Sequence, residues 1–367
     1  MERQEPPYVY CQGRRMLMMS SNEYLGLSMH PRVVRAAQEA AERWGASSCG
    51  SRLANGSRQY HRELEEELAS FLGVESTHVL SAGYLACMGA ITGIARRGDV
   101  LILDKSVHAC LWDGAKISEA DVERFSHENM ESLEMLLSSL DPEQPKIIVV
   151  DGIYSMEGHI THLPEIVDLA KRYQAFLIVD DAHGLGVLGD NGAGVGEYYQ
   201  LTSEIGVLAG SFSKALGSIG GFMAGRRETI EYLRSHCRQI IFSAALSPMN
   251  AAAALAALQV IKDEPERRSK LWENTRYFKN CLKELNVSFL DSPSPATPIV
   301  IGEKEKCYFI WQSLWEQGFF TVMSISPGVP PGMDMIRVAI TSEHRKEDLD
   351  NFITALRVAF KKAHFRV

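Results

Sequence analysis

The sequence lacks paired cysteines, long apolar runs and an excess of basic residues. Its seven cysteines are scattered and form no Cys-X-X-Cys pair, which argues against a zinc ribbon or a disulfide framework and favours a reducing compartment. No run reaches the ~20 apolar residues of a membrane span, and the N-terminus has no signal-peptide core. The formal net charge of -8 gives no reason to expect nucleic acid. We therefore expect a soluble protein of the cytoplasm.

Length and apolar content indicate a large core. At 367 residues and 46% hydrophobic, the chain suggests two domains or one large domain with an appendage. We expect an N-terminal segment over 1–45, a large domain over 46–262 and a small C-terminal α+β domain over 263–367. The stretch SPSPATP near Ser292 is the expected hinge or linker.

Short apolar runs alternate with helical patterns through the large domain. The runs are STHVLSA, DVLILD, KIIVVD, AFLIVD, IGVLAG and GGFMAG, and helical periodicity marks RELEEELASFL, ENMESLEMLLSSL and LPEIVDLAKRY. Because parallel strands need crossovers, this order predicts an α/β fold with a doubly wound, mostly parallel sheet. A long helix is expected over ERRSKLWENTRYFKNCLKEL, and strands near TPIVI, FTVMSI and IRVAI.

The informative polar residues follow the strands, because ligands collect at the carboxyl ends of parallel strands. The turn at Gly83 and Tyr84 opens a helix whose free N–H groups suit a phosphate, although such a turn alone is commonly a plain connection. The later runs are followed by His108, Ser155, Asp180 with His183, and Ser211 with Lys214.

Asp180 and Lys214 carry the chemical interpretation. Asp180 ends the apolar run FLIV, where a carboxylate needs a partner; a helix N-cap is the plain alternative, but it does not explain the adjacent Asp181. Lys214 stands alone in GSFSKALGSIGG. A desolvated lysine can form an imine with an aldehyde, and a buried carboxylate can keep a pyridine nitrogen protonated. Together with His108 and a phosphate cradle, they indicate pyridoxal 5'-phosphate (PLP).

Three residues outside these strand ends have competing interpretations. Arg337 lies in the apolar run MIRVAI, where its guanidinium needs an anion such as a carboxylate, or else faces solvent from an edge strand. Asn22 in SSNEYLG has a strong alternative as a turn residue. His61 is expected only to cap or anchor the helix that contains it.

Eight segments occur in an order that resembles the α-oxoamine synthases, which are fold-type I PLP enzymes. They are SNEYLGL, GSRLANGS followed by His61, SAGY, DKSVHA, VVDGIYSMEG, VDDAHGLGVLG, GSFSKALGSIGG and IFSAALSP. The resemblance extends from about Ser20 to about Asp350. It implies an acyltransferase that condenses an amino acid with an acyl thioester, loses CO2 and gives an α-amino ketone. The resemblance implies no metal ion in this reaction.

The resemblance also implies roles for the residues that would surround the cofactor ring. Lys214 would form the Schiff base and later remove the substrate α-proton. Asp180 would pair with the pyridinium nitrogen, and His108 would stack on the ring. His183 and Ser155 would contact the ring hydroxyl.

Further roles concern the phosphate and the substrate. The backbone at Gly83 and Tyr84 would hold the phosphate together with Ser211, and Ser243 would complete the phosphate site of a neighbouring subunit in a homodimer. The amino-acid carboxylate would be met by Asn22 and Arg337.

Several segments look closest to bacterial serine palmitoyltransferases, which implies L-serine and a long-chain acyl thioester as substrates and 3-ketosphinganine as product. Glycine or alanine with acyl-CoA, as in 8-amino-7-oxononanoate synthase or 2-amino-3-ketobutyrate ligase, stays open. So does an acyl carrier protein as donor, in a module of a polyketide-type pathway. The short segment before SNEYLGL fits this module, a compact lineage or a truncated chain.

The sequence departs from the family pattern at four positions. Cys87 stands where many relatives have asparagine, Cys110 where serine is usual, and Ala244 and Ser211 where threonine is common. Two other classes also remain. An aminotransferase or aldolase would share Lys214 and Asp180, and a non-catalytic subunit would typically lack the lysine.

Overall fold

The computed structural model describes residues 1–364, and the chain divides into two compact units. Unit 1 contains Met1–Met29, Ser155–His159 and the residues from Pro265 on. Unit 2 contains His30–Tyr154 and Ile160–Glu264. Within residues 1–364, none of the helices has the length and apolar character needed to cross a bilayer.

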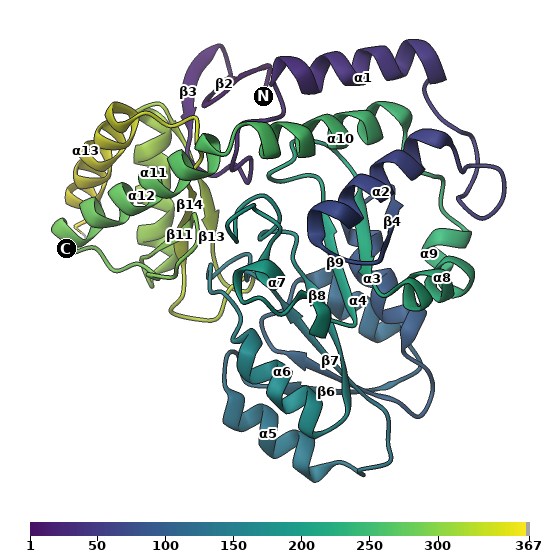
Figure 1. Ribbon diagram of the computed structural model, residues 1–367. Helices are drawn as coiled ribbons and strands as arrows, with labels where there is room; N and C mark the ends of the chain where they lie inside the picture. Colours follow the sequence, from purple (N-terminus) through teal and green to yellow (C-terminus); the bar gives the residue numbers. More distant parts are fainter. Residues whose placement is uncertain (365–367) are drawn as a thin grey trace. The chain divides into compact units, whose positions relative to one another are not determined.

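Unit 2 is built around a seven-stranded sheet (Figure 1). The strand order is β4 (Ser76–Leu80), β10 (Gly221–Gly225), β9 (Val207–Ser211), β8 (Ala175–Asp180), β7 (Lys146–Asp151), β5 (Val100–Asp104) and β6 (Asp121–Phe125). Strands β9, β8, β7, β5 and β6 pair in parallel. This arrangement is the α/β sheet that the alternating sequence pattern predicts.

Strand β10 is the exception, because it runs antiparallel to both of its neighbours. The run GGFMAG resembles the parallel strands in composition, but only residues 212–220 connect it to β9. A parallel crossover needs a dozen or more residues.

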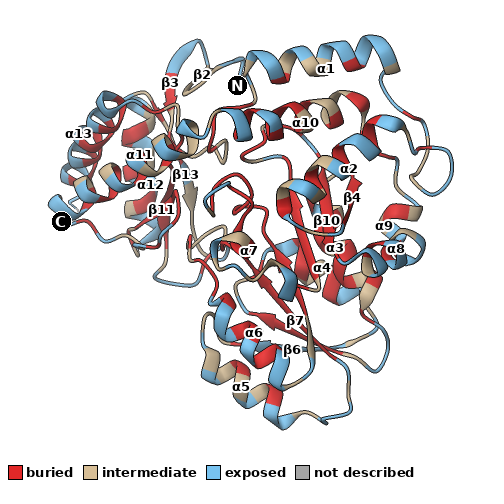
Figure 2. Cartoon of the chain, in the orientation of Figure 1, coloured by how far each residue is buried: buried red, intermediate tan, exposed pale blue. Residues whose placement is uncertain are grey.

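The sequence also did not indicate β6, an edge strand whose residues are mostly exposed and which therefore shows no apolar run. Every residue of β4, β5, β7, β9 and β10 is buried (Figure 2).

Helices pack against this sheet, and some of them pack against other helices. Helix α3 (Gly83–Ile94) packs on β9 and β10, α2 (Gln59–Leu72) on β4, α6 (Leu163–Arg172) on β8, and α1 (Pro31–Trp44) on α10 (Pro248–Asp263). The others are α4 (Ala109–Ile117), α5 (Met130–Ser139), α7 (Val195–Tyr198), the 3-10 helix η1 (Thr202–Glu204), α8 (Arg227–His236) and α9 (Arg238–Ile241). The three helical patterns predicted in this region correspond to α2, α5 and α6.

Unit 1 has its own core between short sheets and three helices. One sheet contains β1 (Arg3–Glu5), β2 (Tyr8–Cys11), β3 (Arg14–Met18) and β12 (Phe319–Phe320); the other contains β11 (Ala296–Val300), β14 (Met335–Ala339) and β13 (Val322–Ser324). The helices are α11 (Glu266–Glu284), α12 (Lys304–Glu316) and α13 (Lys346–Lys362).

Two expectations for unit 1 need correction. The predicted strand FTVMSI is divided at Thr321 into β12 and β13, which belong to different sheets. The stretch SPSPATP is not a hinge, because Ser292 and Ser294 are buried within unit 1 and the stretch runs directly into β11.

His61 anchors the start of α2, as the sequence predicts. Its Nδ1 accepts a hydrogen bond from the Arg58 backbone N–H at 3.1 Å, and its Nε2 lies 2.8 Å from the Leu246 carbonyl oxygen, which accepts from it. Both ring nitrogens therefore have backbone partners in the neutral tautomer. Burial lowers the pKa of His61 to about 4.

This shift predicts an acid-sensitive contribution to stability. Because the folded pKa lies below the unfolded value of 6.5, the neutral ring stabilises the fold above pH 6.5, and this contribution is lost as the pH falls towards 4. At 1.36 kcal/mol per pKa unit the loss approaches about 3 kcal/mol. Urea unfolding at pH 7 and pH 4.5 should show a smaller acid-induced loss for His61→Gln than for the wild type or for His236→Gln, which alters an exposed histidine. Equal losses in all three proteins would contradict this assignment.

Candidate active site

Asp180 is the last residue of β8 and is 6% exposed. One oxygen accepts a hydrogen bond from the Ala182 N–H at 3.0 Å, and the other accepts from the Cys110 thiol at 3.6 Å. Among residues 1–364, no lysine, arginine or histidine forms an ion pair with it. A buried carboxylate of this kind calls for a cationic partner.

Asp151 lies beside Asp180 at the same edge of the sheet, because the register of β7 and β8 pairs the two residues. Burial raises the pKa of Asp151 well above its usual value, and the negative charge of Asp180 raises it further. Two adjacent buried carboxylates would repel each other. The raised pKa favours the neutral form of Asp151, which reduces the repulsion between the two carboxyl groups.

His108 stands at the N-terminus of α4, and the residue as a whole is exposed although its imidazole is partly desolvated. Its Nδ1 accepts from the Cys110 N–H at 3.3 Å and lies 2.9 Å from the Cys110 sulfur. The interaction with the Cys110 thiol raises the pKa of His108, while burial opposes it and the charge of Lys214 lowers it. The His108 N–H donates to both carboxyl oxygens of Asp151, at 3.2 and 3.3 Å. An exposed imidazole face is thus held near Asp180.

Lys214 lies in the connection from β9 to β10 and is half-buried. Its carbonyl oxygen accepts from the Gly217 N–H at 3.0 Å, which fixes the backbone of the turn. Its ammonium group has no hydrogen-bond or ion-pair partner among residues 1–364. The electrostatic effect on His108 shows that the two predicted residues, brought from different strands, lie in the same region of unit 2.

The start of α3 forms a small cradle beside the end of β9. The helix begins at Gly83, and no side chain in the described part of the chain caps it. A Cβ at Gly83 would lie 2.5 Å from the Ser211 Cβ, so glycine is what allows the helix to begin against this serine. The Ser211 hydroxyl lies 2.7 Å from that of Ser213. Uncapped N–H groups and two hydroxyls suit a phosphate.

Tyr84 and His183 occupy different surroundings. Tyr84 is exposed, donates its hydroxyl to Asp113 and meets the His108 ring edge-on at 6.2 Å between centroids. His183 is buried in the turn after β8. The nearby Asp181 holds the backbone of this turn in place.

The Asp181 carboxylate is buried and accepts from the Val195 N–H at 2.7 Å. Burial raises the pKa of Asp181 to about 8. Gly194, at a φ of 97°, packs where a side chain would overlap this carboxylate. Asp181 and the neighbouring glycines therefore position the turn that carries Asp180 and His183. This role explains why they are present, which could not be explained from the sequence alone.

Unit 1 holds a second group of predicted residues. Arg337 on β14 is 7% exposed, and its Nε donates to the Ser155 carbonyl oxygen at 2.7 Å. Its Nη2 is buried without a hydrogen-bond partner among residues 1–364. The Asn22 side-chain oxygen is also buried without a partner. Ser20 donates to the Arg337 carbonyl oxygen at 2.5 Å, which ties the segment before Asn22 to β14.

Two further observations concern residues near these groups. Burial raises the pKa of Tyr24, and the positive charge of Arg337 opposes that rise, so Tyr24 lies close to the guanidinium. The sequence does not single out Tyr24. Ser155 contacts Arg337 through its carbonyl oxygen, while its predicted contact with a ring hydroxyl stays a prediction.

Ser243 lies between α9 and α10 and is half-buried. The adjacent Ala244 forms an antiparallel bridge with Ser51, which joins this loop to GSRLANGS. Leu53 and Phe242 in the two loops are 55% and 71% exposed.

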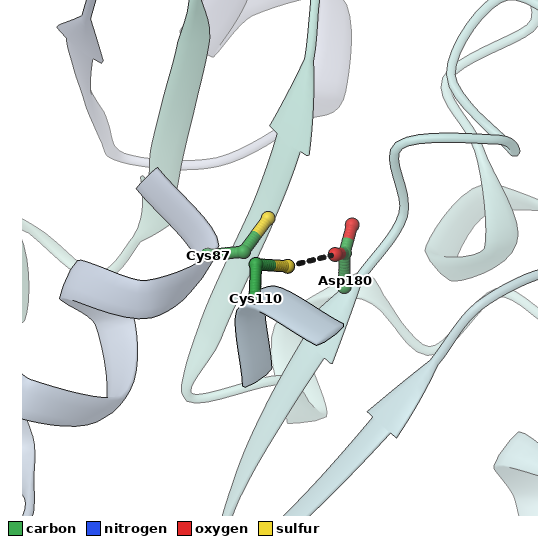
Figure 3. A group of neighbouring side chains, drawn as sticks. All are labelled: Cys87, Cys110 and Asp180. Carbon is green, nitrogen blue, oxygen red and sulfur yellow. Dashed lines mark hydrogen bonds between the residues drawn. The ribbon is translucent and has the colours of Figure 1, made fainter. Parts of the chain in front are cut away.

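The sequence did not bring Cys87 and Cys110 together with Asp180. Cys87 is on α3 and Cys110 on α4, yet their sulfur atoms and an Asp180 oxygen all lie within 4.8 Å of one another (Figure 3). The only feature of the sequence that could have drawn attention to these two cysteines is that each stands where the family pattern usually has a different residue, asparagine or serine.

Comparison with known proteins decides the family. The model for aminotransferase class I and II matches residues 14–356. The chain belongs to this family. It is 39% identical over 355 residues to a serine palmitoyltransferase of Sphingobacterium spiritivorum, covering 97% of this chain and 89% of that protein. It is 40% identical over 357 residues to an 8-amino-7-oxononanoate synthase of Thermoanaerobacter pseudethanolicus, covering 97% and 90%.

A solved serine palmitoyltransferase structure with PLP matches at a TM-score of 0.97 and 32% identity, covering all of this chain and 93% of the other. The fold is therefore that of the fold-type I PLP transferases, as the sequence predicts. The chain is a PLP-dependent acyltransferase of the α-oxoamine synthase group, and its cofactor is PLP.

The residues of unit 2 fit this cofactor. Among the described residues, the buried Asp180 carboxylate lacks a cation and the Lys214 ammonium lacks a partner, and the start of α3 offers N–H groups beside Ser211 that no described side chain caps. These three features match the ring nitrogen, the aldehyde and the phosphate of PLP in chemical character.

Proposed function

We propose that this enzyme condenses L-serine with a long-chain acyl thioester, of coenzyme A or of an acyl carrier protein, and releases CO2 and the thiol. The product would be a 3-ketosphinganine-like α-amino ketone. The names of the relatives and the similarity to a solved serine palmitoyltransferase support this choice. The alternative is the 8-amino-7-oxononanoate synthase type of reaction, which a relative of 40% identity supports.

The observation that carries the proposal is Arg337, a buried guanidinium with an unpartnered Nη2. A buried arginine with a free donor suits a carboxylate ligand, because the charge is then neutralised and the donor is satisfied. We infer that Arg337 binds the amino-acid carboxylate and that the unpartnered oxygen of Asn22 accepts from the substrate nearby. Tyr24, close to Arg337, would help to orient the guanidinium.

The residues of unit 2 would serve the reacting centre. When bound, PLP supplies a ring that takes up the electron pair released at the amino-acid α-carbon. Asp180 would hold the ring nitrogen in its protonated form. Lys214 would anchor the cofactor and accept the α-proton on its Nζ, and His108 would cover one face of the ring. His183 and Ser155 would position the ring hydroxyl, and the backbone at Gly83 and Tyr84 would bind the phosphate with Ser211.

We further propose that the enzyme is a cytoplasmic homodimer in which Ser243 contributes to the phosphate site of the partner. The exposed Leu53 and Phe242 beside this residue support the interface. The seven scattered, unpaired cysteines support a reducing compartment.

A substrate screen tests the reaction. Purified PLP-loaded enzyme is titrated with glycine, L-alanine, L-serine and L-threonine while the cofactor absorbance is followed, and acyl thioesters of several lengths are then added for product detection by mass spectrometry. L-serine with a long-chain thioester should give the amino ketone. Product from L-alanine but not from L-serine would assign the alternative reaction. Formation of pyridoxamine phosphate with amino acid alone would contradict both.

The role of Arg337 predicts a selective loss of amino-acid binding. Arg337→Lys keeps the charge but loses the planar donor pair, so the KM for the amino acid should rise roughly 10-fold to 100-fold, the range of a charged hydrogen bond worth about 1.5–3 kcal/mol. The KM for the acyl thioester should change far less. Arg357→Lys, at an exposed arginine of unit 1, is the matched control. An unchanged amino-acid KM in a folded Arg337→Lys enzyme would contradict the role.

A further inference from the structure

Cys87, Cys110 and Asp180 form a compact group in unit 2 (Figure 3). The three residues come from α3, from α4 and from the end of β8, and all are buried. Their sulfur and oxygen atoms lie within 4.8 Å of one another, and the Cys110 sulfur is 3.6 Å from an Asp180 oxygen. The figure shows the Cys110 sulfur directed towards that carboxylate, with the Cys87 sulfur beside it.

One of these separations matches an edge of a tetrahedral metal site, and the other two are at most 4.8 Å. With metal–sulfur bonds of about 2.3 Å and a metal–oxygen bond of about 2.1 Å, a tetrahedral zinc ion spaces sulfur and oxygen about 3.6 Å apart and two sulfurs about 3.8 Å apart. The 3.6 Å between the Cys110 sulfur and the Asp180 oxygen equals this sulfur–oxygen spacing, and the Cys87 sulfur lies at most 4.8 Å from both atoms, so a side-chain adjustment of about 1 Å would complete the three-ligand set. Two thiolates and one carboxylate are a ligand set that selects a thiophilic divalent cation.

The surroundings would support such a site. His108 Nδ1 lies 2.9 Å from the Cys110 sulfur, so an imidazole stands next to one ligand as a hydrogen-bond partner. The Ala182 N–H holds the other Asp180 oxygen at 3.0 Å. The missing Cys-X-X-Cys motif excludes a zinc ribbon but not this group, because the ligands come from separate elements.

We propose that Cys87, Cys110 and Asp180 bind a thiophilic divalent cation such as zinc, and that this cation and PLP exclude each other because both use the Asp180 carboxylate. The exclusion rests on the proposed role of Asp180, whereas the metal site itself does not. A metal bound there would neutralise the charge that the cofactor ring requires.

Zinc binding to the full chain tests the site. The PLP-free protein, kept reduced with a phosphine, is equilibrated with zinc chloride, passed through a desalting column and analysed for metal by mass spectrometry. One zinc ion per chain is expected. Cys87→Ser and Cys110→Ser should each weaken binding by more than the roughly 10-fold to 100-fold that changes outside the ligand shell produce.

Two other cysteines provide matched controls. Cys237→Ser alters a buried thiol outside the group and Cys49→Ser an exposed one, and neither should change zinc binding. Circular dichroism melting verifies that the serine variants are folded. Absence of bound zinc, or its retention in both folded Cys87→Ser and Cys110→Ser, would overturn the site.

Cofactor uptake tests the exclusion separately. With free zinc held at about ten times its dissociation constant, the apparent affinity for PLP should fall about 10-fold, as followed by cofactor absorbance, and Cys110→Ser should abolish the difference. Zinc held by the cysteine pair with unchanged PLP uptake would overturn the exclusion. Failure of the zinc-free chain to take up PLP would instead count against the proposed function.

Discussion

The buried carboxylate of Asp180 is the constraint on which the rest of the site depends. An ion of this kind costs several kcal/mol to bury unless a cation or sufficient hydrogen bonds compensate it. Here one backbone N–H and one thiol contact it, and burial raises the pKa of the neighbouring Asp151, which favours its neutral form. A protonated ring nitrogen is the complementary group for the buried carboxylate at the end of β8.

The fold explains why this charge and its partners meet. The parallel register of β7 and β8 brings Asp151 and Asp180 to one edge of the sheet, and α4 begins there with His108. The short connection from β9 to β10 carries Lys214 to the same region, and Gly83 lets α3 start against Ser211. Each functional side chain follows a strand end or a helix start, where the backbone direction is set by the core.

Much of this could be read from the sequence because buried parallel strands are continuous apolar runs with polar residues just beyond them. Lys214 and Asp180 were visible as polar residues in apolar or glycine-rich surroundings. The direction of β10 follows from the length of the connection before it and not from its composition. Strand β6 is too polar to recognise, and the pairing of β3 with β12 joins residues about three hundred positions apart. The group of Cys87 and Cys110 arises from packing of α3 against α4, which no local pattern encodes.

The most direct measurement is the position of the covalent link between protein and cofactor. The PLP-loaded enzyme is reduced with borohydride, digested and mapped by mass spectrometry. The account predicts a single pyridoxyl modification, on Lys214. It also predicts that Asp180→Ala protein fails to retain PLP and therefore carries no modification. A stoichiometric modification of another lysine, with Lys214 unmodified, would contradict it.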